Sequence, residues 1–342
     1  MCIRDRFVND TANPGAAGVT VHLYRDDGAV VGEPDATDSL IDTKLTGASG
    51  QYFFEGLLVS PYYVVVDSTT VDPSAGGSGW AEQTYGATGA ATYSGSYTYS
   101  VAAGPRYGGL QPTVSDNAAA LTSSEHVIWL DLIGGDHVEE VDFGFSFNVV
   151  TNLEGGDASS PQGSLRQFIA NANGVTGSNV MRFVPAVGTN ATDGTNDWWS
   201  LAVTTALPSI VDDVTTVDGT AYDTNDGVTV LDPNGAGPEL EIVGPGAAPV
   251  MDGVVVTAAN SVVADVVIGG FGSGVGVLIN GGSATGNSVV ASYLGTNATG
   301  DAASPNGVGV SIAGGASANT IGGTTSPDSN TISGNSGHGV FI

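Results

Sequence analysis

The C-terminal part of the chain repeats a short apolar segment at a nearly constant period. Residues 276–279 read Gly-Val-Leu-Ile, residues 309–312 read Gly-Val-Ser-Ile and residues 339–342 read Gly-Val-Phe-Ile, so the segments start 33 and 30 residues apart. A period of roughly 20–50 residues is typical of solenoid proteins, in which each unit buries its apolar face against the next. The sequence therefore predicts a stack of similar units in this half of the chain.

Short apolar runs between these segments each follow an asparagine, at Asn287, Asn319 and Asn330. Asparagine tolerates the left-handed backbone that a tight corner needs, and its amide can bond to the equivalent asparagine of the next unit. This pattern favours parallel β-coils that are stacked in register.

The composition is that of an all-β chain. Glycine accounts for 52 of 342 residues and charged residues for only 12%, while hydrophobic residues reach 41%. The hydrophobic fraction is large enough to build a core, so disorder is excluded. The scarcity of charged helix formers excludes an ordinary helical enzyme.

The charge balance excludes nucleic-acid partners. There are 7 Lys and Arg residues against 35 Asp and Glu, which gives a formal net charge of −28. Binding to nucleic acid or to an anionic membrane surface requires basic residues. No run of 18 apolar residues is present, so we expect no membrane insertion in this fragment.

Both ends of the chain carry signs of an incomplete sequence. Residues 1–6 contain two of the seven basic residues and the only cysteine, Cys2, and we interpret them as a non-native start. The single cysteine excludes an internal disulfide framework. At the other end the repeats stop at Ile342 without a cap, so we expect the coils to be truncated there.

Residues 7–147 have the alternating pattern of a β-sandwich. Val19, Val21 and Leu23 alternate with polar residues and lead to a predicted turn at Asp26-Asp27-Gly28. Tyr52 and Phe54 alternate in a second predicted strand, residues 62–66 in a third, and residues 138–147 form a late apolar strand. Residues 72–125 have the appearance of an insertion.

This part resembles the B-type domains of bacterial surface proteins of the serine-aspartate repeat and collagen-adhesin kind. The similarity lies in Gly-Val-Thr-Val at 18–21, in Gly-x-Tyr-x-Phe-x-x-Leu at 50–57, in Tyr-x-Val-x-Val at 62–66 and in Val-Asp-Phe-Gly-Phe at 141–145. The resemblance implies a prealbumin-like sandwich.

One amphipathic helix is expected after residue 148. Ser164 and Gln167 have the spacing of a capping box, and residues 165, 168, 169 and 172 form one apolar face. Residues 149–167, 293–300 and 319–323 resemble the opening and the coil repeats of right-handed parallel β-helices in large bacterial secreted proteins. In such proteins the helix caps the first coil.

The resulting fold class is all-β, with a prealbumin-like sandwich followed by a right-handed parallel β-helix that has a short N-terminal capping helix. We expect the sandwich at 7–147, the cap at 148–183 and the coils at 184–342.

Catalytic residues are sparse in the expected coils. From Asn190 to Ile342 there is no Lys or Arg, which removes the usual base of a polysaccharide lyase. Beyond Val266 the only carboxylates are Asp301 and Asp328, in turn-like sequence. Hydrolysis of a glycoside needs two carboxyl groups held together. We therefore predict no catalytic residues and no required cofactor in this chain.

Asp223, Asn225 and Asp226, followed by Gly227, partly match a calcium loop, in which oxygens at alternate positions converge on the ion. Position twelve is Asn234 and not a bidentate Glu, so an Asx-rich turn is the alternative. Calcium is thus the one cofactor that the sequence suggests.

Aromatic residues gather between Trp80 and Tyr107. Trp80, Tyr85, Tyr97 and Tyr99 are the candidate ligand-binding residues, because exposed aromatic rings are typical of surfaces that bind glycans or proteins. The alternative is a hairpin that buries these rings.

From these patterns we expect a non-catalytic fragment of a large exported bacterial protein, extracellular or on the cell surface, which acts as a stalk or an adhesin and has a glycan or a cell-surface partner. The alternative is the N-terminal part of a polysaccharide lyase or hydrolase whose catalytic coils follow Ile342.

Overall fold

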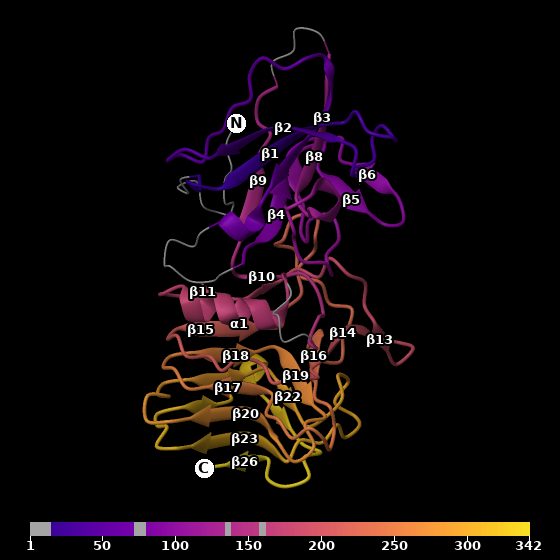
Figure 1. The fold of residues 1–342 in the computed structure, drawn as a ribbon. Helices are drawn as coiled ribbons and strands as arrows, with labels where there is room; N and C mark the ends of the chain where they lie inside the picture. Colours follow the sequence, from indigo (N-terminus) through magenta and orange to yellow (C-terminus); the bar gives the residue numbers. More distant parts are fainter. Residues whose placement is uncertain (1–14, 72–79, 134–137, 157–161) are drawn as a thin grey trace.

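The computed structural model describes residues 15–71, 80–133, 138–156 and 162–342. The interpretation of residues 1–6 concerns residues outside these ranges. Strands account for 35% and helices for 6% of the structure, as expected for an all-β chain. An N-terminal unit of antiparallel sheets and a C-terminal unit of parallel sheets follow one another along the molecule (Figure 1).

The N-terminal unit is built around a four-stranded antiparallel sheet with the order β2-β1-β3-β8. Its strands are β1 (Thr20–Arg25), β2 (Ser39–Leu45), β3 (Ser60–Val66) and β8 (Val127–Leu132). Val19, Val21 and Leu23 are at most 2% exposed, which confirms the alternation in the sequence. They pack in one core with Val64, Phe143 and Phe145, among others.

A second sheet, with the order β7-β4-β9, supplies the other side of this core. It contains β7 (Gly104–Pro105), β4 (Glu82–Gly86) and β9 (Phe143–Ser146). The central strand β4 lies inside residues 72–125, so this part of the expected insertion belongs to the sheet itself. Only the hairpin of β5 (Ala91–Tyr93) and β6 (Tyr97–Tyr99) forms a separate two-stranded sheet.

Two local expectations in the N-terminal unit are wrong. Tyr52 and Phe54 do not lie on a regular strand, although Tyr52 is buried and its hydroxyl donates to the carbonyl of Val141 at 2.8 Å. The connection from β1 to β2 is a loop of residues 26–38 and not a tight Asp-Gly turn. Aspartate side chains shape this loop, because their carboxylates accept hydrogen bonds from backbone N–H groups. In a tight turn those N–H groups would bond to backbone carbonyls instead.

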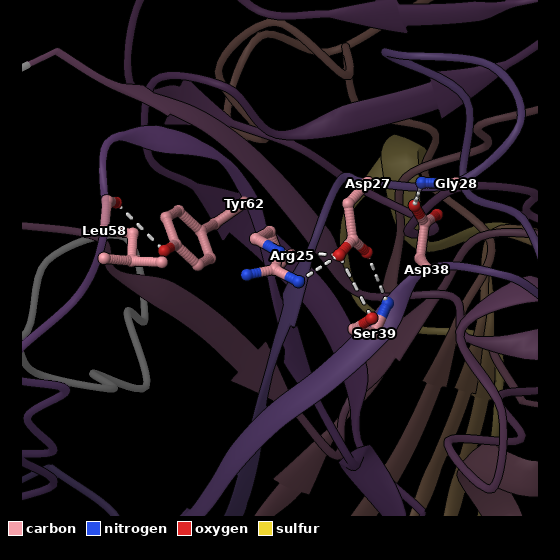
Figure 2. Close-up of polar contacts among 7 residues, drawn as sticks. All are labelled: Arg25, Asp27, Gly28, Asp38, Ser39, Leu58 and Tyr62. Atoms are coloured by element: carbon pink, nitrogen blue, oxygen red, sulfur yellow. Dashed lines mark hydrogen bonds and ion pairs between the residues drawn. The ribbon is translucent and has the colours of Figure 1, made fainter.

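Figure 2 shows the polar contacts that close this loop. Asp27 pairs with the guanidinium of Arg25 and accepts from the backbone N–H of Ser39 at 2.9 Å. Asp38 accepts from the N–H of Gly28, also at 2.9 Å. The start of β2 is therefore fixed to the end of β1.

The expected helix is present as α1 (Leu165–Gly174). The hydroxyl of Ser164 accepts from the N–H of Gln167 at 3.1 Å, as a helix cap does. The side chain of Gln167 does not return to the cap but donates to Asn171 at 2.7 Å, so the reciprocal half of the capping box is missing. The apolar face is buried in the core of the C-terminal unit, with Leu165, Phe168, Ile169 and Ala172 at most 1% exposed.

The C-terminal unit contains three sheets that are parallel except for the short hairpin strand β13. The first has β11 (Asn179–Val180), β15 (Thr215–Asp218), β18 (Val262–Ala264), β21 (Ser288–Val290) and β24 (Thr320–Ile321). The second has β13 (Ala191–Thr192), β14 (Asp197–Ala202), β16 (Leu240–Val243), β19 (Val266–Gly269), β22 (Tyr293–Leu294) and β25 (Thr331–Ile332). The third has β17 (Val254–Val256), β20 (Val275–Asn280), β23 (Val308–Ala313) and β26 (Val340–Phe341).

From β15 onward the chain visits the three sheets in turn, and we call one such pass a coil. The sequence repeats occupy one register, since Val277 pairs with Val310 and Val310 pairs with Val340. Two further strands, β10 (Val149–Val150) and β12 (Arg182–Phe183), form a parallel pair of their own.

Asparagines, of which Asn287 is buried, clamp successive coils together. The side-chain oxygen of Asn287 accepts from the N–H of Ser261 at 2.8 Å, and its amide donates to the carbonyl of Ala258 at 2.9 Å. In the same way, the side-chain oxygen of Asn319 accepts from the N–H of Asn287, and its amide donates to the carbonyl of Ala284. Asn330 repeats this bonding at another corner. The expected asparagine contact between coils is therefore present, as a bond from backbone to side chain.

A buried polar junction connects the two units. The side chain of Asn171 on α1 accepts from the N–H of Trp80 at 2.8 Å and donates to its carbonyl at 3.0 Å. Gln162 donates to the carbonyl of Ala81 at 2.6 Å and accepts from the N–H of Asp116 at 3.0 Å. Gln162 and Asn171 are at most 3% exposed. The two units thus share hydrogen bonds that water cannot easily replace.

Candidate functional site

Three carboxylates from two successive coils lie at the corner between the first and second sheets. Asp218 ends β15 and pairs with Ala264, so Asp265 follows directly after the partner of Asp218. Glu239 precedes Leu240, which pairs with Val266, so Glu239 and Asp265 occupy equivalent positions on neighbouring strands. Adjacent strands are about 4.8 Å apart, which brings these side chains within mutual reach. We call Asp218, Glu239 and Asp265 the carboxylate corner.

Burial and repulsion between carboxylates alter the acidity of Glu239 and Asp265. Burial raises the pKa of Glu239 to about 7, and the charges of Asp232, Asp265 and Asp218 add to the shift. Burial likewise raises the pKa of Asp265 to about 6, together with the charge of Asp218. Asp218 accepts from the N–H of Thr220 at 2.9 Å. A neutral acid and an ionised base can therefore coexist here near pH 7.

The carboxylate corner places two carboxyl groups with raised pKa values at equivalent positions of neighbouring strands, as an acid–base pair requires. Glu239 and Asp265 are not among the residues predicted from the sequence, because they are separated from Asp218 by 21 and 47 residues along the chain. The signal that could have found them is the strand register, which requires knowing how the coils align. An isolated pair of adjacent carboxylates is not by itself evidence of catalysis.

The calcium candidate forms a self-contained turn. Asp223 accepts from the N–H of Asn225 at 2.8 Å, and Asp226 accepts from the N–H groups of Val228 and Thr229, both at 2.8 Å. The hydroxyl of Thr229, which donates to Asp226 at 2.6 Å, lowers the pKa of Asp226, and these backbone bonds and the charge of Arg182 contribute to the shift. Oxygens of Asp223 and Asp226 thus accept backbone N–H groups, and the charge of Arg182 is close to Asp226. This bonding is that of the Asx-rich turn, the alternative to a calcium loop.

Metal ligands do not converge elsewhere in the described ranges. Among these residues, no group of three or more His, Cys, Asp or Glu side chains is arranged to hold a metal ion.

Of the aromatic candidates, Trp80 and Tyr85 belong to the framework. Trp80 bonds to Asn171 through its backbone, and its indole N–H donates to the hydroxyl of Ser68 at 3.1 Å. Tyr85 lies on β4, where it pairs with Pro105 and Gly144 of the flanking strands. Both residues therefore lie outside the β5–β6 hairpin, on which Tyr97 and Tyr99 lie.

Tyr97 and Tyr99 lie on one face of β6 and are half-buried, while Thr98 between them is exposed. Tyr99 packs against Trp129 with ring centroids 5.6 Å apart, and its hydroxyl donates to the carbonyl of Gly32 at 2.7 Å. Tyr97 instead contacts Tyr93 at 5.0 Å. Since Tyr93 is 38% exposed, the pair of Tyr93 and Tyr97 is the aromatic surface that the hairpin presents.

Comparisons with known proteins give no relative. No family model matches the chain, no curated protein matches its sequence and no solved structure matches its fold. In the part of the chain that is described, no helix is long and apolar enough to cross a membrane.

Proposed function

We propose that this protein is a non-catalytic segment of an exported bacterial surface protein and acts as a rigid stalk or adhesin. In this proposal the N-terminal unit is a prealbumin-like B-type sandwich and the C-terminal unit is a right-handed parallel β-helix capped by α1. The observation that carries the proposal is the junction of Gln162 and Asn171, which fixes the first unit to the capped end of the second.

The geometry of the parallel sheets supports the β-helix. Each coil adds one strand to every sheet, and connections between parallel strands are right-handed almost without exception. The apolar residues that face inward form one continuous core along the coils. In such a stack each coil contacts only the coils next to it. The number of coils can therefore vary without a change in the cross-section, which suits a spacer.

The surface chemistry supports an extracellular role and a glycan or cell-surface partner. A chain with a net charge of −28 stays soluble and repels nucleic acid and anionic membranes. The exposed ring of Tyr93 beside Tyr97 supplies an aromatic contact of the kind that glycan-binding surfaces use.

The carboxylate corner favours a second candidate function, glycoside hydrolysis. Its raised pKa values match a general acid and a general base, and the two carboxyl groups of such enzymes lie roughly 5–10 Å apart. The absence of Lys and Arg from residue 190 onward argues against a lyase but leaves hydrolysis chemically feasible. We rank this function second because the ring of Trp198, which lies next to the corner on β14, is buried and offers no platform for a sugar.

An activity panel distinguishes the two functions. Acidic and neutral polysaccharides are incubated with the whole chain, with and without calcium, and assayed for reducing ends and unsaturated uronates. The stalk proposal predicts no turnover. Turnover that is lost in Glu239→Gln and Asp265→Asn, but retained in the turn variant Asp223→Asn, would replace it with the hydrolase. Glycan-array binding that is lost in Tyr93→Ala and Tyr97→Ala would identify the ligand surface.

A further inference from the structure

Within the described ranges, strand β2 forms an edge of the four-stranded sheet that no other strand pairs with. From Asp42 onward its backbone groups alternate in direction, whereas the register against β1 shifts before that point and leaves Ile41 as an extra residue in a bulge. Thr46 directly after β2 bonds to β1, since its N–H donates to the carbonyl of Val19 at 2.9 Å. By this alternation Lys44 and Asp42 also face β1, whereas Thr43 and Leu45 turn their N–H and C=O groups outward. The N–H of Thr43 indeed donates to the side chain of Asp42, at 2.8 Å. The edge can therefore accept another strand.

The side chains along this edge are unusual for an exposed strand. Leu40, Ile41 and Leu45 are 54%, 40% and 67% exposed. Lysine often protects a free edge against pairing, but Lys44 is neutralised by Asp42, which lies 2.7 Å away on the same strand. The edge thus combines backbone groups that no other described strand pairs, apolar side chains and no net charge. Pairing at Thr43 exchanges its local N–H bond to the Asp42 side chain for a bond to the second copy.

The strand is also complementary to itself. If two copies of β2 pair in antiparallel orientation with Thr43 on the two-fold axis, Asp42 lies opposite Lys44 of the second copy, within the part of β2 that follows the bulge at Ile41. Oppositely charged pairs stabilise neighbouring strands, whereas like charges in opposition destabilise them. An axis through Asp42 or through Lys44 would place like charges opposite each other, so the charges select the axis at Thr43.

The backbone directions agree with this register. Residues on a two-fold axis can exchange two hydrogen bonds only if their N–H and C=O groups point out of the sheet, as those of Thr43 do. Asp42 and Lys44 then occupy the closely spaced pairs that lack backbone bonds, where side chains approach most closely. The strand is held in place for this contact by Asp27 at its start and by Thr46 at its end.

We propose that two copies of this chain associate through antiparallel pairing of their β2 strands, centred on Thr43, to form one continuous eight-stranded sheet. This contact is a symmetric interface of the kind that homodimers use. It goes beyond the proposed function, because it joins two stalks side by side through their N-terminal units and requires neither a glycan nor catalysis.

Charge exchange tests the interface. The mass of the whole chain is measured by sedimentation as a function of concentration, at an ionic strength near 0.15 M, where long-range repulsion between the acidic chains is screened. The parent chain is expected to approach twice its 34.0 kDa as concentration rises. Lys44→Asp and Asp42→Lys each place like charges opposite one another, so each should weaken the dimer by about tenfold or more. The double variant Asp42→Lys with Lys44→Asp restores opposite charges and should restore the dimer.

Matched controls separate this effect from folding and from net charge. Glu55→Lys changes the net charge as much as Asp42→Lys does, at an exposed position outside β2, and should leave the dimer intact. Thermal melts should show that each variant remains folded. A parent chain that stays monomeric overturns the proposal. So does a dimer that both single variants retain, or one that the double variant fails to restore.

Discussion

The backbone N–H of Asn287 donates to the side-chain oxygen of Asn319 at 2.9 Å, although the two residues are 32 positions apart in the chain. The amide of Asn319 in turn donates to the carbonyl of Ala284 at 3.0 Å. One asparagine thus satisfies a donor and an acceptor on the preceding coil. Part of the free energy that holds the coils together therefore comes from amide side chains at their corners.

Asn287→Ala should destabilise the C-terminal unit. Asn287 is 1% exposed, and the substitution leaves the N–H of Ser261 and the carbonyl of Ala258 buried without their partner. Each such group costs about 1–3 kcal/mol of unfolding free energy. Chemical denaturation measures the loss. The exposed turn variant Asn225→Ala should change stability by no more than about 0.5 kcal/mol, and equal effects in both would contradict the clamp.

Phe168→Ala should destabilise the C-terminal unit by about 3–5 kcal/mol, because it leaves a cavity where α1 covers the core. Phe168 is 1% exposed and packs in the same core as Leu165 and Ile169. Denaturation followed by tryptophan fluorescence measures the change, with Val180→Ala as a control, since Val180 is 49% exposed. A change as small as that of the control would show that α1 does not cap the core.

Stability should fall as the pH rises from about 4.5 to about 8. Burial raises the pKa of both Glu82 and Glu125 to about 8, and both are 4% exposed. Their folded-state pKa values lie above the unfolded value, so the stabilising contribution is complete below pH 4.5 and is lost as the pH approaches 8. The slope should be up to about 1.4 kcal/mol per pH unit for each group. Denaturation curves recorded across this range measure it.

Neutral substitutions assign this pH dependence to its source. Glu82→Gln and Glu125→Gln cannot ionise, so each should flatten the decline between pH 4.5 and 8. Glu33→Gln, on an exposed loop, should leave it unchanged. A smaller decline should remain in the double Gln variant, because the raised pKa values of Glu239 and Asp265 act in the same direction. A decline as steep as that of the parent chain would mean that other groups control it.

Local periodicity predicted the elements that depend on neighbouring residues. The buried face of α1, the alternation at Val19 to Leu23 and the common register of the glycine-led repeats follow from sequence alone. The structure of the β1 to β2 loop does not follow from the sequence alone. Asp27 and Asp38 organise this loop by bonding to backbone N–H groups 12 and 10 residues away along the chain.

Contacts between distant segments could not be read from the sequence. Asn171 lies 91 positions from Trp80, and nothing in either segment shows that they meet. For the same reason β4 was placed in an insertion, whereas it pairs with β9 at the end of the unit. The carboxylate corner depends on how Glu239 aligns with Asp265, which only the stacking of the coils decides.

The distance distribution between one label on each unit tests most directly whether the chain is a rigid stalk. In a Cys2→Ser background, spin labels are attached through Thr98→Cys and Ser283→Cys, two exposed positions on β6 and after β20. Pulsed dipolar spectroscopy should give a single narrow distribution, because the Asn171 and Gln162 junction fixes the units, and Asn171→Ala should broaden it. A broad or bimodal distribution in the parent chain would contradict the rigid stalk.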